Sequence, residues 1–270
     1  MDKASHGGPG TRDRIYSWST YHAYRRWVGA FLDYCRENGR PTDLASCRQY
    51  AGPWIRSMAE GGKYSAWTLN LARSAVAKLY GESGDRIAHL PPRRREDITR
   101  SRRGVAMDSR IRDEWGPLMD FCRATGLRRH ELEKLRGTDL SQPPGGPPRL
   151  EVKGKGGKVR SAPVVGDPGA VQAVVEACIS AGRGLVWPEV PEKLDIHSLR
   201  AEYAEAVYRA AERPLGSLKG HELYHCRGDR VGIAYDREAL RAASAALGHG
   251  RVSVVADHYL WGPGYTRCNI

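Results

Sequence analysis

One stretch, GESGDRIAHLPPRRREDITRSRRG at residues 81–104, most constrains the organisation of this chain of 270 residues. It holds two adjacent prolines and seven arginines, a composition typical of a solvated connection rather than of a packed element. Apolar patterning occurs on both sides of it, so we expect two domains. The expected boundaries are a loose tail at 1–16, a helical domain at 17–82, a basic linker at 83–104 and a second domain at 105–270.

The first domain shows the period of amphipathic helices. From Ser17 onward, apolar residues such as Tyr24, Trp27 and Phe31 recur at steps of three and four. Similar patterns predict a helix over 43–60, kinked or interrupted by Pro53, and another over 65–80.

The second domain mixes helical patterns with one alternating segment. RLEVKGKGGKVRSAPVV at 149–165 alternates, turns at its glycines and alternates again, which predicts a β-hairpin. Helices are predicted over 108–126, 128–136, 169–182, 195–212, 237–248 and 251–260. The expected fold class is therefore mainly α with a small antiparallel β-sheet in the second domain, an α+β arrangement.

Charge indicates the class of partner. The formal net charge is +12, and residues 1–104 carry 19 Lys and Arg against 10 Asp and Glu. This favours an anionic polymer such as a nucleic acid over a basic surface that only maintains solubility. The expected DNA contacts are basic residues of the linker and of the hairpin: Arg93, Arg94, Arg95, Arg100, Arg102, Arg103, Lys153, Lys158 and Arg160.

Other site classes have little support in the sequence. The six cysteines form no CxxC pair, and the grouping of His221, His225 and Cys226 lacks a second ligand pair, so we expect neither a metal site nor a disulfide framework. No apolar run of the length of a membrane span or a signal core is present. We expect a cytoplasmic, nucleoid-associated protein with reduced thiols, no membrane partner and no cofactor.

Several polar residues stand at positions that suit phosphodiester chemistry. Two guanidinium groups can bind the non-bridging oxygens of a phosphate whose transition state spreads negative charge. A histidine can take the proton of a phenol, a lysine can protonate a leaving alkoxide, and a tyrosine can attack and hold the phosphate as an ester. The candidates, in chain order, are Arg128, Lys155, His197, Arg200, His249 and Tyr259.

Taken singly, each candidate has a structural interpretation, such as a solvated helix arginine, an ordinary turn lysine or a core tyrosine. Their order carries more weight. The boxes are ATGLRRHELEKLRGTDL at 124–140, VKGKGGKVRSAPV at 152–164, HSLR at 197–200 and LGHGRVSVVADHYL at 247–260. In these stretches, and in its helical segment 17–82, the chain resembles the tyrosine recombinases, or lambda-type integrases.

That resemblance implies a role for each candidate. Arg128 and Arg200 would clamp the phosphate, and Lys155 would be the general acid for the leaving 5′-hydroxyl. His197 would assist as base, His249 would hydrogen-bond a non-bridging oxygen, and Tyr259 would form a 3′-phosphotyrosyl link. The family also implies two domains that enclose DNA, two protomers on each core site, four in a synapse, and a Holliday junction. No metal or ATP is implied.

The chain departs from the family pattern in one internal feature. Arg200 and His249 are 49 residues apart, which is wider than the family's usual gap. Residues 213–236 are therefore expected to be an inserted loop or hairpin. Such an insertion could contact DNA or a neighbour, but more often it is only surface decoration. The eleven residues after Tyr259 are short for the C-terminal helix that family members dock. The absence of a small domain before residue 17 favours a compact recombinase acting at core sites.

The expected function is site-specific DNA recombination for the integration or excision of a mobile element. Two alternatives use the same fold. A repressor or architectural protein would bind DNA without cutting it, and a type IB topoisomerase would use the same chemistry without sequence specificity.

Overall fold

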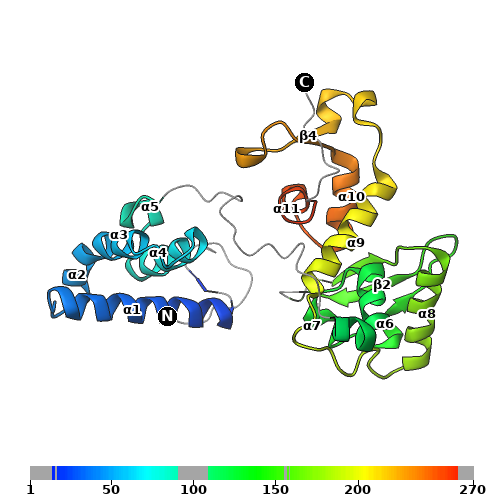
Figure 1. Cartoon of the computed structure of the whole chain (residues 1–270), viewed down its shortest axis with the longest axis horizontal. Coiled ribbons are helices and arrows are strands. Elements are labelled where there is room, and N and C mark those ends of the chain that lie inside the picture. Colours follow the sequence, from blue (N-terminus) through cyan, green and yellow to red (C-terminus); the bar gives the residue numbers. More distant parts are fainter. Residues whose placement is uncertain (1–13, 16, 91–108, 155–156, 158, 261–270) are drawn as a thin grey trace. The chain divides into compact units, whose positions relative to one another are not determined.

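The computed structural model describes residues 14–15, 17–90, 109–154, 157 and 159–260. The chain divides into two compact units, Met1–Ile98 and Thr99–Ile270, which are described separately (Figure 1). The predicted linker beyond residue 90 lies outside the described residues, as does most of the predicted N-terminal tail.

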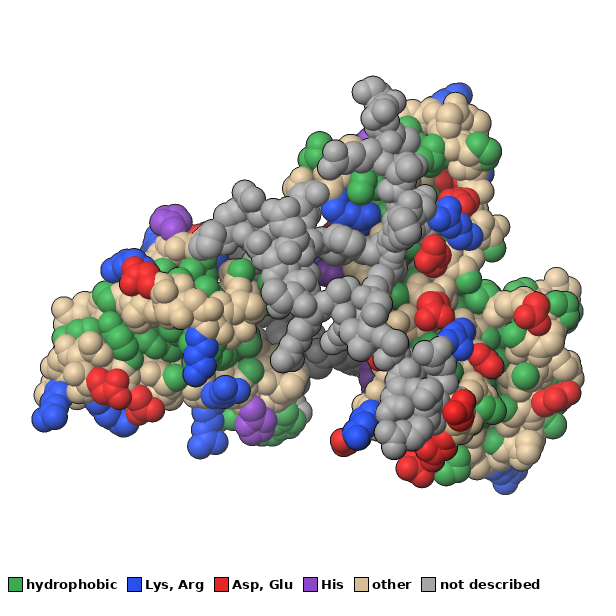
Figure 2. Space-filling model, in the orientation of Figure 1, with side chains coloured by type: hydrophobic (Ala, Val, Ile, Leu, Met, Phe, Trp, Pro, Cys, Tyr) green, Lys and Arg blue, Asp and Glu red, His purple; other side chains and the backbone are tan. Residues whose placement is uncertain are grey.

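The first unit is all-helical in its described part. It contains α1 (Trp18–Asn38), α2 (Leu44–Cys47), α3 (Ala51–Glu60), α4 (Ala66–Tyr80) and α5 (Gly84–Ile87). Ser17 and Ser65 accept hydrogen bonds from backbone N–H groups three residues on, which is why α1 and α4 begin where they do. Figure 2 shows Lys and Arg side chains along α1 on the visible face of this unit.

The helices of the first unit enclose one core, formed around Trp27 and Phe31 of α1, Trp54 of α3 and Val76 of α4. Ile87 belongs to the same core and is 5% exposed. Helix α5, which lies within the first residues of the predicted linker, therefore packs against α4 and contributes to the core of the first unit.

The predicted helix over 43–60 is interrupted before its proline. A short 3₁₀ turn, Arg48–Tyr50, separates α2 from α3. Pro53 lies in the first turn of α3, where a missing N–H costs no intrahelical hydrogen bond. The interruption is confirmed, but the proline does not cause it.

The second unit combines helices with two small antiparallel sheets. Its helices are α6 (Ser109–Thr125), α7 (Arg129–Leu132), α8 (Pro168–Ala181), α9 (Ile196–Ala211), α10 (Arg237–Leu247) and α11 (Val252–His258). Its strands are β1 (Leu140–Ser141), β2 (Arg149–Lys153), β3 (Val159–Pro163), β4 (Leu223–His225) and β5 (Ala234–Asp236). Strands β1, β2 and β3 form one sheet in that order, and β4 pairs with β5. The predicted fold class is confirmed.

The sheets match the predicted hairpins. Strands β2 and β3 pair from Arg149↔Pro163 to Lys153↔Val159 around the predicted glycine-rich turn. The insertion at 213–236 forms the β4–β5 hairpin, one of the two alternatives that the sequence allows. The helix predicted over 128–136 is shorter, since only Arg129–Leu132 is helical before the chain turns toward β1.

Two hydrophobic cores share α9, and this arrangement positions the site. Ile196 and Leu199 pack with α6, α8 and the three-stranded sheet, whereas Tyr203 and Val207 pack with α10 and α11. His197 and Arg200 therefore lie on the part of α9 where the two cores meet. On the visible face of this unit, acidic and basic side chains are mixed (Figure 2). Within the described part of the chain, no helix has the length and apolar character that crossing a membrane requires.

Candidate active site

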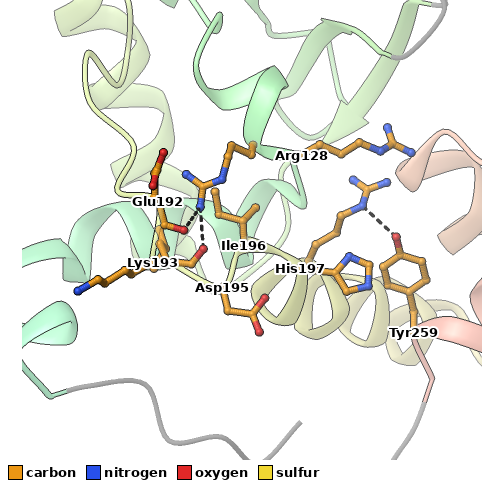
Figure 3. A pocket seen from close by; sticks show the side chains of 10 residues that line it. Arg128, Glu192, Lys193, Asp195, Ile196, His197 and Tyr259 are labelled. Carbon is orange, nitrogen blue, oxygen red and sulfur yellow. Dashed lines mark hydrogen bonds between the residues drawn. The ribbon is translucent and has the colours of Figure 1, made fainter. Parts of the chain in front are cut away.

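A pocket of about 560 Å³ in the second unit brings together residues from three separate sequence boxes. Arg128, Arg129, His197, Arg200 and Tyr259 line it, together with the segment 192–196 that leads into α9 (Figure 3). These residues come from α7 and its N-cap, from α9 and from the end of α11. The fold thus collects side chains that are up to 131 positions apart in the sequence.

Arg200 is the buried centre of this pocket, with 2% of its surface exposed. Its guanidinium donates hydrogen bonds to the carbonyl of Gly126 and, at 2.6 Å, to the carbonyl of Leu247. Burial lowers the pKa of Arg200 to about 10, and the neighbouring Tyr259 opposes this change, so the side chain remains a cation at neutral pH. A buried, hydrogen-bonded cation of this kind is preorganised to bind an anion.

Tyr259 follows the last turn of α11, and its hydroxyl accepts a hydrogen bond from Arg200 Nε at 3.4 Å (Figure 3). Its ring centroid lies 5.3 Å from that of His197 and 5.5 Å from that of His249. The backbone N–H of Tyr259 donates to the Val255 carbonyl at 3.0 Å, which holds the residue to the helix end. The phenol is therefore surrounded by one guanidinium and two imidazoles.

His249 is placed by the end of α10. Gly248 ends that helix at a φ of +69°, which a glycine adopts without strain, and the N–H of His249 donates to the Ser244 carbonyl at 2.8 Å. Burial, followed by the charges of Arg200 and Arg128, lowers the pKa of His249 to about 4, so the imidazole is neutral at pH 7. Its buried Nε2 atom has no hydrogen-bond partner among the described residues. A neutral imidazole with an unused nitrogen is suited to bind an incoming oxygen.

Arg128 is oriented by a buried carboxylate. Glu131, with a fully buried side chain, accepts hydrogen bonds from the backbone N–H of Arg128 at 2.8 Å and from Arg128 Nη1 at 2.9 Å. It also accepts from Arg160 Nη2 at 2.8 Å. Burial alone would raise the pKa of Glu131, but Arg160 and Arg128 together bring it to about 2. The carboxylate is therefore ionised and holds the Arg128 guanidinium through its Nη1 group.

This network corrects one prediction from the sequence. Arg160, expected to contact DNA, is 9% exposed, and its guanidinium donates to Glu131 and to the carbonyl of Ala246. Its position on β3 points it into the unit, where it connects the hairpin to α7 and α10. Lys153, by contrast, is exposed at the end of β2, and its contact with DNA stays a prediction.

The remaining predicted residues lie outside the described part of the chain. They are Lys155 and Lys158 of the hairpin turn and Arg93, Arg94, Arg95, Arg100, Arg102 and Arg103 of the linker. Their assigned roles stay predictions.

Sequence reasoning did not assign a role to Arg129. Its guanidinium donates to the backbone carbonyls of Val190 at 3.1 Å, Glu192 at 3.1 Å and Leu194 at 2.8 Å. It thereby anchors the segment that precedes α9, and this segment forms one wall of the pocket. Its position beside Arg128 in the sequence is the only signal that could have indicated it. Among the described residues, no three His, Cys, Asp or Glu side chains are grouped so that they could hold a metal ion.

Comparison with solved structures shows that this chain has the fold of the tyrosine recombinases. XerH site-specific recombinase, bound to a palindromic difH substrate after cleavage, has a TM-score of 0.54 at 14% identity over 91% of this chain and 76% of that chain. Its pre-cleavage complex gives a TM-score of 0.51 at 15% identity over 90% and 76%. The Tn1549 transposon integrase, in complex with circular intermediate DNA, gives 0.50 at 12% identity over 92% and 91%.

Sequence comparisons add nothing to this likeness: no family model matches the chain, and no curated protein matches it. At such low identities the likeness of the solved structures defines the fold alone.

Proposed function

We propose that this protein is a site-specific DNA recombinase that cleaves and rejoins DNA strands through a covalent 3′-phosphotyrosyl intermediate. Its substrate is double-stranded DNA. The biological role we favour is the integration or excision of a mobile element. The fold, shared with structures solved in complex with DNA, supports DNA as the partner. The net charge of +12 supports it independently.

The observation that carries the proposal is the setting of Tyr259. Its hydroxyl lies 3.4 Å from Arg200 Nε, and both imidazole rings lie within 5.5 Å of its own ring. A packing tyrosine needs one hydrogen-bond partner, and it does not need a guanidinium and two imidazoles around its ring. A nucleophile that attacks a phosphodiester needs positive charge for the phosphate and a base for its proton.

Cleavage would transfer the scissile phosphate from the 5′-oxygen to Tyr259. The Tyr259 oxygen attacks the scissile phosphorus and forms a new P–O bond, while its proton passes to His197. The bond from phosphorus to the 5′-oxygen breaks, and Lys155 supplies the proton that makes this leaving group a 5′-hydroxyl. Arg128 and Arg200 neutralise the non-bridging oxygens, and His249 donates a hydrogen bond to one of them from its Nε2 atom.

Religation reverses the same step with a different strand. The 5′-hydroxyl of the partner duplex attacks the phosphotyrosine, and Tyr259 leaves. Because the phosphoester retains the energy of the broken bond, the cycle needs no nucleotide cofactor. Two protomers on each site and four in a synapse would exchange the strands in turn through a Holliday junction, and the helical first unit would also contact the duplex. Such a protein acts on the nucleoid in the cytoplasm.

The test begins with the target, which can be selected by binding from a library of random-sequence duplexes. A selected duplex is then nicked next to the scissile position. After cleavage, the fragment that carries the new 5′-hydroxyl diffuses away, so the covalent complex accumulates. The proposal predicts a protein–DNA adduct stable to denaturant in the wild-type chain and none in Tyr259→Phe. Selective binding without any adduct would instead show a non-catalytic DNA-binding protein. Relaxation of arbitrary supercoiled plasmids would show a topoisomerase.

A further inference from the structure

The inserted hairpin at 213–236 is firmly attached at its base. Arg213, just after α9, makes two hydrogen bonds at 2.8 Å with the two carboxylate oxygens of Asp236, whose side chain is fully buried. Asp236 also caps α10 by accepting from the backbone N–H of Glu238 at 2.9 Å. A segment closed in this way at its entry and exit has little freedom to move as a loose surface loop.

The second half of the hairpin also contacts α11 and the residue that follows Tyr259. Arg230 is 5% exposed, and its guanidinium donates to the carbonyl of Ala256 and, at 3.2 Å, to that of Leu260. Tyr235, fully buried, accepts from Arg230 and donates its own hydroxyl proton to the Leu260 carbonyl at 3.0 Å. The two bonded carbonyls belong to residues on either side of Tyr259 in the sequence.

The backbone at this point needs external support. Helix α11 has only seven residues, and an isolated helix of that length is unstable in water. The carbonyls of its last turn have no partner within the helix, so they need donors from elsewhere. Tyr259 itself has left the helix, with φ of −120° and ψ of −36°. A charged donor makes a stronger hydrogen bond than a neutral one, and burial excludes competing water.

We propose that the inserted hairpin is a brace for the nucleophile, in which Arg230 and Tyr235 are positioning residues that hold the backbone around Tyr259. Surface decoration would not bury a guanidinium on these two carbonyls. A DNA contact would leave the guanidinium at the surface, whereas the Arg230 side chain is directed into the unit. The inference rests on the proposed function, because the brace matters for catalysis only where Tyr259 attacks DNA.

The experiment uses the full chain and the selected nicked duplex, with protein in excess, so that the first-order rate of adduct formation reports on the bound complex. The variants are Arg230→Met, Arg230→Lys and Tyr235→Phe. Arg227→Met is the matched control, since Arg227 is an exposed arginine of the same hairpin. DNA affinity and the melting temperature are measured for each variant.

The brace predicts that Arg230→Met slows adduct formation on the order of a hundredfold while DNA affinity is unchanged, because a small displacement of a nucleophile costs about this much. Arg230→Lys should recover part of the rate, and Arg227→Met should match the wild type. A substrate whose leaving 5′-oxygen is replaced by sulfur should not rescue Arg230→Met. A better leaving group compensates for a missing general acid and not for a misplaced tyrosine.

The brace would be overturned if Arg230→Met formed the adduct at the wild-type rate. It would also be overturned if this variant lost DNA affinity while its rate of adduct formation at saturation stayed unchanged. If Arg230→Met fails to fold, Tyr235→Phe decides, since it removes a single hydroxyl: an unchanged rate refutes the brace. If the wild-type chain forms no adduct at all, the proposed function fails. The brace is then judged by hydrogen exchange across 252–260, which must quicken in Tyr235→Phe and stay unchanged in Arg227→Met.

Discussion

Replacing Glu131 by glutamine tests the buried network behind the arginine clamp. In the wild-type chain, both carboxylate oxygens accept hydrogen bonds, from Arg128 and from Arg160. The amide of glutamine has one oxygen and one NH₂ group, so its NH₂ would face an arginine N–H. The variant therefore keeps the shape of the side chain, removes its charge and leaves two guanidiniums without their counter-ion.

The magnitude follows from the pKa of the carboxyl. It falls from 4.5 in the unfolded chain to about 2 in the folded one, which corresponds to about 3 kcal/mol of stability at pH 7. Breaking a buried ion pair by removing one partner costs roughly 3–5 kcal/mol, in agreement with that value. Because the folded pKa lies below the unfolded one, the contribution is complete above pH 4.5 and is lost as the pH falls toward 2.

The assay must resolve the second unit from the first, since two units need not unfold in one transition. Hydrogen exchange of peptides covering 118–135, measured at increasing urea, gives the local free energy of unfolding. Glu133→Gln is the matched control, an exposed glutamate two positions away. We expect a loss of about 3 kcal/mol for Glu131→Gln at pH 7, little change for Glu133→Gln, and a shrinking difference between wild type and Glu131→Gln below pH 4.5.

Equal stability of Glu131→Gln and the wild-type chain at pH 7 would refute the reasoning. So would an equal loss in both glutamine variants, because the effect would then come from charge at the surface and not from the buried network.

Three further predictions concern packing, pH and salt. Gly126→Ala should cost about 1–3 kcal/mol in the same urea titrations, because its φ is +59° and a Cβ there would lie 2.1 Å from Cδ1 of buried Tyr203. Gly29→Ala, where a Cβ would meet no atom within 4 Å, should instead stabilise α1 by about 0.5–1 kcal/mol, measured by hydrogen exchange of α1 peptides in urea. The free energy of unfolding should fall as the pH drops from 6.5 toward about 4, because the unfolded state protonates His249 before the folded state does. A His249→Gln variant whose free energy of unfolding changes with pH in parallel with the wild type would contradict this. DNA affinity should fall steeply with salt, by a log–log slope of about 0.9 for each phosphate contact, and a flat titration would exclude a large phosphate footprint.

The long periodic elements could be predicted from the sequence because their own residues determine them. Helices α1, α4, α8, α9 and α10 begin and end within one or two residues of their predicted ranges, and their caps are visible in the sequence. The boundary after α4 could not be predicted. Ile87 lies between Gly84 and the proline pair at 91–92, and only the three-dimensional core shows that it packs with the first unit.

In the site, too, some features could be predicted from the sequence and others could not. Three of the four boxes contribute side chains that lie close together, because each box has its own pattern of residues, whereas Lys155 of the hairpin box lies outside the described residues. Their buried partners have no such pattern. Arg160 looks like any other arginine of a basic hairpin, and only the packing of β3 against α10 turns it inward to Glu131. Arg230 and Tyr235 are signalled by nothing except the unusual length of the gap between Arg200 and His249.

The central claim is that Tyr259, among thirteen tyrosines, becomes linked to DNA. The most direct measurement is peptide mapping by mass spectrometry of the adduct trapped on the nicked duplex, after digestion of both protein and DNA. The account predicts a single nucleotide-bearing peptide whose modified residue is Tyr259. Modification of another tyrosine, such as Tyr224, Tyr235 or Tyr265, would contradict it.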